Sequence, residues 1–164
     1  MNDYRAGIEA TVNHIALVFF ATFSRFEFAL KRSGYVSGQI GHKVSPNWNL
    51  FGNQLGVPFF EQMKNSAVAR VFFYAPPKRL ILTADSGVEF CKQPAPVNTQ
   101  TLLEAVCLVR NNLFHGEKPT ITERDERLLH ASLYVLDSAY VVAQKHDEMQ
   151  KFCKAFPYSD INQH

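Results

Sequence analysis

The sequence predicts an all-α fold, a helical bundle of four to five helices with one long irregular connection and a small peripheral β-hairpin. Three observations lead to this prediction. Apolar residues recur every three or four positions over long segments, glycine or proline separates these segments, and only one short stretch alternates as a strand does. The chain has 164 residues, of which 46% are hydrophobic and 20% charged, which is the size and composition of one globular domain.

The first predicted helix covers residues 4–33. Its apolar residues follow one another at intervals of three or four, so they form one continuous stripe. The members of this stripe are Ile8, Val12, Ile15, Phe19, Phe23, Phe26 and Leu30. Phe20 and Phe28 widen the stripe, and we therefore expect this helix to be buried on more than one side. Gly34 marks its end.

A turn-rich connection follows at residues 34–58, where five glycines and two prolines occur. A connection of this length is uncommon in a compact domain unless it is functional or contains a helix of its own. Residues 47–55 fit such a short helix. Helical spacing returns at residues 59–73, and the proline pair at 76–77 ends that helix. Residues 79–90 alternate weakly around an Asp-Ser-Gly turn, which predicts a short peripheral hairpin.

Two further helices are predicted in the second half of the chain. Asn98 is a good N-cap for the first of them, residues 102–109 supply its apolar side, and Gly116 suits its C-terminal end. The stretch Thr120–Glu123 fits a capping box that opens the last helix, which continues to about Ala143.

We therefore expect one helical domain at residues 1–145, followed by a polar C-terminal extension at residues 146–164. Phe152 and Phe156 indicate a short further element within the extension. The chain has 14 phenylalanines, which fit either an aromatic core or a dimer interface.

Charge and cysteine content favour a cytoplasmic protein without a metal or cofactor. The net charge of +2 is too small to indicate a nucleic-acid binder by itself, although an active site needs only a local patch. Cys91, Cys107 and Cys153 match no metal or redox spacing, and reduced thiols are the simplest interpretation. The N-terminus does not have the features of a signal peptide, and the longest apolar run, Ile15–Phe23, is too short to span a membrane.

The most informative stretch is Arg-Asn-Asn-Leu-Phe-His-Gly at residues 110–116. Arg110 is a permanent cation that can bind a phosphate with two hydrogen bonds. His115 can give or take a proton near neutral pH. These are the two roles that phosphodiester cleavage requires when no metal takes part. The structural alternative is that Arg110 complements the helix dipole and His115 caps helical carbonyls or faces water.

The order Arg110-Asn111, three residues, His115 resembles the RNxxxH signature of HEPN domains (higher eukaryotes and prokaryotes nucleotide-binding). The flanking text LLEAVCLVRNNLFHGEKP is similar to the helix before the family's motif and the turn after it. The resemblance extends less specifically over most of residues 20–140. Glu27 falls where the family's first long helix has an acidic residue, and NWNLF is similar to a Trp-containing stretch in one bacterial subgroup. The family's small helical bundle agrees with the fold that the periodicity predicts.

The resemblance implies a metal-independent endoribonuclease that acts as a toxin or antiviral defence effector. In this hypothesis the RNA 2′-hydroxyl attacks the adjacent phosphate and leaves a 2′,3′-cyclic phosphate. His115 moves the protons, Arg110 binds the scissile phosphate, and Asn111 orients the phosphate or the helix end. Glu27 is expected either to support Arg110 from across the bundle or to face solvent.

The expected partners are RNA and a second copy of the chain. Lys31 and Lys118 are candidates for an RNA path. Residues five apart on a helix differ by about 140° in direction, so Arg110 and His115 share a site only if His115 lies on the turning helix end or if two motifs meet in a homodimer. An antitoxin or inhibitor protein is a further expected partner, but Glu117 stands where one subgroup has a tyrosine that its antitoxin modifies. The alternatives are a non-catalytic HEPN module that binds a nucleotide or a protein, and a purely structural helical dimer.

Overall fold

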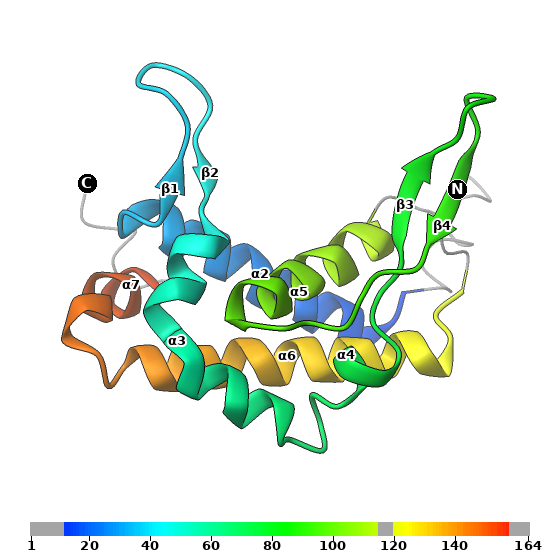
Figure 1. Ribbon diagram of the computed structural model, residues 1–164. Coiled ribbons are helices and arrows are strands. Elements are labelled where there is room, and N and C mark those ends of the chain that lie inside the picture. The colour runs from blue at the N-terminus through cyan, green and yellow to red at the C-terminus, as the bar shows by residue number, and fades with distance from the viewer. Residues whose placement is uncertain (1–11, 115–119, 158–164) are drawn as a thin grey trace, which may run out of the picture.

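The computed structural model describes residues 12–114 and 120–157, and this part of the chain is mostly helical (Figure 1). Its helices are α2 (His14–Arg32), α3 (Trp48–Lys64), α4 (Val71–Tyr74), α5 (Thr99–Phe114), α6 (Glu123–Ala143) and α7 (Gln150–Ala155), with a 3₁₀ turn η1 (Asp147–Met149). Two antiparallel strand pairs complete the described residues: β1 (Val36–Ser37) with β2 (Ser45–Pro46), and β3 (Arg79–Leu82) with β4 (Val88–Cys91). The predicted all-α bundle with a small hairpin is thus confirmed at the level of fold class.

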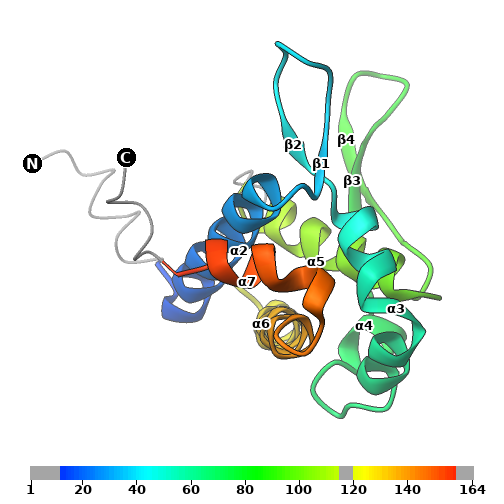
Figure 2. The same ribbon diagram turned by 90° about the vertical axis from the view of Figure 1, so that its left-hand side faces the viewer.

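The long helix α6 underlies the bundle. Helices α2, α3 and α5 all pack against it, α5 also packs against α3 and α2, and α7 packs against α2 and α6. Both hairpins project from the same side of the bundle, as two perpendicular views show (Figures 1 and 2). The β3–β4 hairpin contacts α5, and this contact positions the site described below.

Helix α2 buries the later part of the stripe that the sequence predicts, whereas Val12 is exposed and Ile8 lies outside the described residues. Phe19, Phe23, Phe26 and Leu30 are all buried. The helix begins at His14, because the Asn13 Oδ1 atom accepts hydrogen bonds from the backbone N–H groups of the first turn. The expected wider burial is wrong at Phe20, which is 44% exposed because α2 presents this face to solvent.

Helix α3 joins two elements that the sequence suggests as separate. The short helix expected at 47–55 is confirmed, with Asn47 as its N-cap, but it continues through a kink at Gly56 into the next predicted helix. Gly56 has φ 74° and ψ −173°, a conformation that only glycine adopts without strain. Pro58 follows the kink, where its missing N–H costs little.

The continuous helix predicted at 59–73 is wrong, because α3 ends at Lys64 and α4 begins only at Val71. The Ser66 hydroxyl accepts hydrogen bonds from the backbone N–H groups of Val68 and Ala69, so a local turn competes with the helix. Ala69 is buried in consequence, whereas Ala67 is exposed.

Both hairpins depend on local turn chemistry. The predicted hairpin at 79–90 is confirmed: Leu80 pairs with Phe90, and Ser86 adopts a positive φ of 64° in the turn. The β1–β2 hairpin was not predicted, since two-residue strands leave no alternating pattern. Its chain reversal uses Gly38 and Gly41, both with positive φ.

Side-chain caps set the starts of α5 and α6. The prediction for Asn98 is confirmed, because its Oδ1 atom accepts a 2.8 Å hydrogen bond from the Thr101 N–H. The capping box of α6, however, joins Thr122 and Asp125 rather than Thr120–Glu123. The reason is that Ile121 packs against the core in the segment before the helix, so the helix begins later.

An aromatic cluster forms the centre of the core. Phe26 contacts the rings of Trp48, Phe51, Phe152 and Phe156, with ring centroids 5.1–6.2 Å apart. Phe152 comes from α7, within the segment that the sequence suggests as a polar extension, and it is fully buried. Residues 146–157 therefore contribute to the same hydrophobic core as the helices before them.

Candidate functional site

Arg110 occupies the C-terminal part of α5 with its guanidinium group against α2. The Arg110 Cζ atom lies 5.7 Å from the centroid of the Phe23 ring, a cation–π arrangement. Arg110 Nη1 donates a 3.1 Å hydrogen bond to the Asn111 Oδ1 atom. The two adjacent residues of the motif are thus joined to each other, and the ring of Phe23 limits the motion of the cation.

One donor of Arg110 has no partner. Its Nε atom is buried and makes no hydrogen bond within the described part of the chain. A buried donor without an acceptor costs about 1–3 kcal/mol, more when it is charged, and so calls for an explanation. A bound anion would supply the missing acceptor.

Glu27 lies in the same neighbourhood without forming an ion pair to Arg110. Burial raises the pKa of the Cys107 thiol to about 12; the Glu27 and Glu104 carboxylates also raise it, and Arg110 opposes them. Glu27 and Arg110 are therefore both close enough to act on Cys107. Across residues 12–114 and 120–157, no carboxylate oxygen lies within 4.0 Å of the Arg110 guanidinium group.

The other residues expected in the site are not brought together by the described structure. His115 and Lys118 lie outside the described residues, which stop at Phe114 and resume at Thr120. Lys31 is exposed in the last turn of α2, eight residues beyond Phe23 and thus about 12 Å further along the helix.

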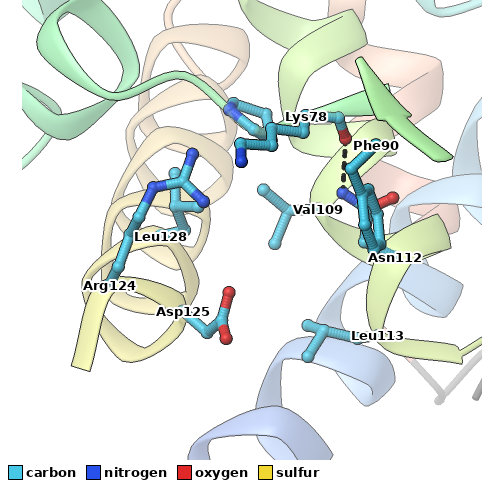
Figure 3. Close-up of a pocket in the computed structure, with 9 residues that line it drawn as sticks. Lys78, Phe90, Val109, Asn112, Leu113, Arg124, Asp125 and Leu128 are labelled. Atoms are coloured by element: carbon cyan, nitrogen blue, oxygen red, sulfur yellow. Dashed lines mark hydrogen bonds between the residues drawn. The ribbon is translucent and has the colours of Figure 1, made fainter. Parts of the chain in front are cut away.

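A cavity of about 140 Å³ lies beside the motif, on the face of α5 that looks towards α6 and the β3–β4 hairpin (Figure 3). Val109 and Asn112 line it from α5, Phe90 from β4, and Arg124 and Asp125 from the first turn of α6. Arg110 points elsewhere, because successive helix residues differ in direction by about 100°. The motif segment of α5 thus has a cation on one face and a polar cavity on another.

Hydrogen bonds fix the polar groups around this cavity. The Asn112 Nδ2 atom donates a 2.7 Å bond to the backbone oxygen of Lys78, which ties the base of the hairpin to α5. Arg124 Nη2 donates to the backbone oxygens of Ala75 and Pro76 at 3.1 and 2.6 Å.

No motif in the sequence singles out Phe90, Asn112 or Arg124, which line this cavity. One signal was present: Arg124 is a cation in the first turn of a helix, where the helix dipole favours acidic residues. The two carbonyl oxygens that Arg124 contacts offset this unfavourable position. Nothing local marked Phe90, since only the fold brings β4 to α5.

Comparison of the chain with protein-family models, curated proteins and solved structures found no match. Within the described residues, no group of three or more His, Cys, Asp or Glu side chains could hold a metal ion. None of the helices in that part of the chain has both the length and the apolar character that a membrane span requires.

Proposed function

We propose that this chain is a metal-independent endoribonuclease of HEPN type, with Arg110, Asn111 and His115 as its active-site residues. The observation that supports the proposal is the state of Arg110: a cation held against Phe23 and Asn111, with a buried Nε–H that has no acceptor among the described residues. A scissile phosphate would satisfy that donor and neutralise the charge.

The proposed reaction needs two proton transfers and one stabilised anion. The 2′-oxygen loses its proton and attacks phosphorus in line, and the bond from phosphorus to the 5′-oxygen breaks as that oxygen gains a proton. The products are a 2′,3′-cyclic phosphate and a 5′-hydroxyl. His115 moves protons in these steps, which is typically worth about 10²–10⁴-fold in rate. Arg110 stabilises the negative charge that develops on the phosphate.

We further propose that the active form is a cytoplasmic homodimer in which two motifs approach one another, as the resemblance to HEPN ribonucleases implies. Helix α2, which carries Phe23 beneath Arg110, also exposes the apolar side chains of Leu17 and Val18. Exposed apolar side chains on the helix that carries Phe23 are compatible with such a dimer. A role as a toxin or antiviral effector, held in check by an inhibitor protein, belongs to the same proposal.

The test is cleavage of a mixed RNA substrate in excess chelator. We expect the wild type to produce cyclic-phosphate ends, and His115→Ala and Arg110→Gln to lose at least about 10²-fold in rate. Matched controls are His130→Ala and Arg70→Gln, since His130 is exposed on α6 and Arg70 is exposed in the turn before α4. Equal cleavage by wild type and His115→Ala, with both proteins folded and dimeric, would contradict the proposal.

A non-catalytic module that binds a nucleotide is the second candidate. The polar cavity beside α5 favours it, because Arg124, Asn112 and Phe90 could hold a ligand without any chemistry. Calorimetric binding of nucleotides by a chain that cleaves no RNA would support this candidate. A chain that neither binds nucleotides nor cleaves RNA would instead fit a structural dimer.

A further inference from the structure

A second hollow adjoins the cavity beside α5 and is strongly cationic. It has a volume of about 320 Å³, and Lys78, Lys92 and Arg124 contribute three positive charges to its lining without any carboxylate. Lys78 and Arg124 also line the smaller cavity, so the two hollows adjoin one another. We call them together the cationic groove, defined by Tyr74, Lys78, Phe90, Lys92, Asn112 and Arg124.

One cation of the groove, Arg124, is positioned before any ligand arrives. Arg124 is held by the backbone oxygens of Ala75 and Pro76 through its Nη2 atom alone. A guanidinium group has five N–H donors, and the Nε and Nη1 atoms of Arg124 make no hydrogen bond to the described residues, so they keep three donors for an anion. Lys78 is held through its backbone oxygen by Asn112, which leaves its ammonium group free to move. A phosphate bound here would pay little of the usual entropy of ordering Arg124.

The carboxylate of Asp125 offsets only part of this charge. It lies on the wall of the smaller cavity, but its Oδ2 atom accepts hydrogen bonds from the Thr122 N–H and hydroxyl, at 3.0 and 2.8 Å. Its role is to cap α6. Among the described lining residues, three cations against this one carboxylate leave a local excess of positive charge that the overall net charge of +2 does not reveal.

Phe90 gives the groove an aromatic wall. It is 36% exposed on β4 and lines the smaller cavity opposite Arg124 (Figure 3). A cavity of about 150 Å³ is known to hold one benzene ring, so the 140 Å³ found here has room for one six-membered ring. Such a space beside an aromatic face suits an unpaired pyrimidine base.

We propose that the cationic groove binds single-stranded RNA, with phosphates at Lys78, Lys92 and Arg124 and a pyrimidine base against Phe90. This inference rests on the proposed function, for which it names the strand that flanks the cleavage site. The smaller cavity is lined by Val109 and Asn112, on either side of Arg110-Asn111 in α5, so a strand in the groove would pass beside the motif.

The experiment measures binding separately from cleavage. A fluorescent 2′-O-methyl oligouridine is used as the probe, because it has no free 2′-hydroxyl and cannot be cleaved by the proposed reaction. Anisotropy titrations at several salt concentrations compare the wild type with Lys78→Gln/Lys92→Gln and with Phe90→Leu. Lys151→Gln is the matched control. Lys151 is exposed on α7, which lies at the opposite end of the molecule from the β3–β4 hairpin (Figure 1).

We expect the double variant to bind at least about fivefold more weakly. The slope of the logarithm of the binding constant against the logarithm of the salt concentration should be smaller in magnitude by about 1.4, because each lost phosphate contact on a single strand removes about 0.7 from it. Phe90→Leu should bind roughly tenfold more weakly through lost stacking. It should also lose the wild-type preference for oligouridine over oligoadenosine. Lys151→Gln should match the wild type.

Unchanged affinity and salt slope in the double variant would refute the proposal that RNA binds in the cationic groove. Equal binding of oligouridine and oligoadenosine by the wild type would also refute it. Cleavage of ordinary RNA is measured in parallel. If the wild type cleaves RNA and the double variant does so with the same KM, the proposal of RNA binding in the groove is wrong, while the proposal of nuclease activity is supported. If the wild type binds through the groove but cleaves nothing, the groove stands and the nuclease proposal fails.

Discussion

Replacing Phe152 by alanine should destabilise the whole bundle, although the residue lies in a segment that the sequence suggests as a polar extension. Phe152 is fully buried. Its ring centroid lies 4.8–6.3 Å from those of four other aromatic side chains, Phe26, Phe51, Tyr140 and Phe156. These neighbours come from three other elements and from the end of α7, so they cannot close the cavity by moving together.

The expected loss in the free energy of unfolding is about 4 kcal/mol, since Phe→Ala substitutions in cores cost about 3–5 kcal/mol and poorly collapsing sites lie at the upper end. For a chain of this size the melting temperature should fall by roughly 8–16 °C. Urea denaturation followed by circular dichroism measures the change. Lys151→Ala is the control, because Lys151 precedes Phe152 on α7 and is exposed. A loss below about 1 kcal/mol for Phe152→Ala would refute the placement of α7 in the core.

Three further predictions concern caps, backbone and thiols. Thr122→Ala should lower the free energy of unfolding, measured by urea denaturation, by about 1 kcal/mol because it removes the capping box of α6. Thr120→Ala should change it by less than about 0.5 kcal/mol. A larger loss for Thr120→Ala than for Thr122→Ala would show that Thr120, and not Thr122, caps the helix. Gly56→Ala should cost about 1–3 kcal/mol in the same assay, because the φ of 74° at the kink of α3 strains any residue with a Cβ atom; a neutral substitution would show that the kink relaxes. At pH 8 a thiol reagent should modify exposed Cys91 but not Cys107 in the folded protein, since burial raises the pKa of Cys107 to about 12 and keeps it protonated. Above pH 9 the unfolded chain loses the Cys107 proton while the folded protein retains it, so that thiol should lower stability as the pH rises towards 12; equal labelling of Cys91 and Cys107 in the folded state would contradict the burial.

Local features of the sequence were sufficient where local physics decides the outcome. The apolar stripe of α2 from Phe19 to Leu30, the cap at Asn98 and the hairpin turn near Ser86 each depend on residues within a few positions of one another. The periodicity of side chains on a helix and the hydrogen bonds of a cap or turn act over that range, so the pattern predicts the element. The motif at Arg110-Asn111 was visible for the same reason.

The break between α3 and α4 could not be predicted from spacing alone. Residues 59–73 keep a helical period, and the competing turn at Ser66 is marginal until Ala69 is packed inside. Tertiary burial decided between two local conformations of similar free energy.

The sequence by itself determined the fold class, most helix positions and the candidate motif, because these follow from patterns that repeat along the chain. Only the tertiary structure decided that Phe152 belongs to the core and that Lys78, Phe90 and Arg124 surround one cavity. Lys78 and Arg124 are separated along the chain by the whole of α5. No local sequence pattern indicates which residues so far apart in the sequence become neighbours in the folded protein. Their meeting depends on how α5, α6 and the hairpin pack, which is a property of the summed burial of the core and not of any single segment.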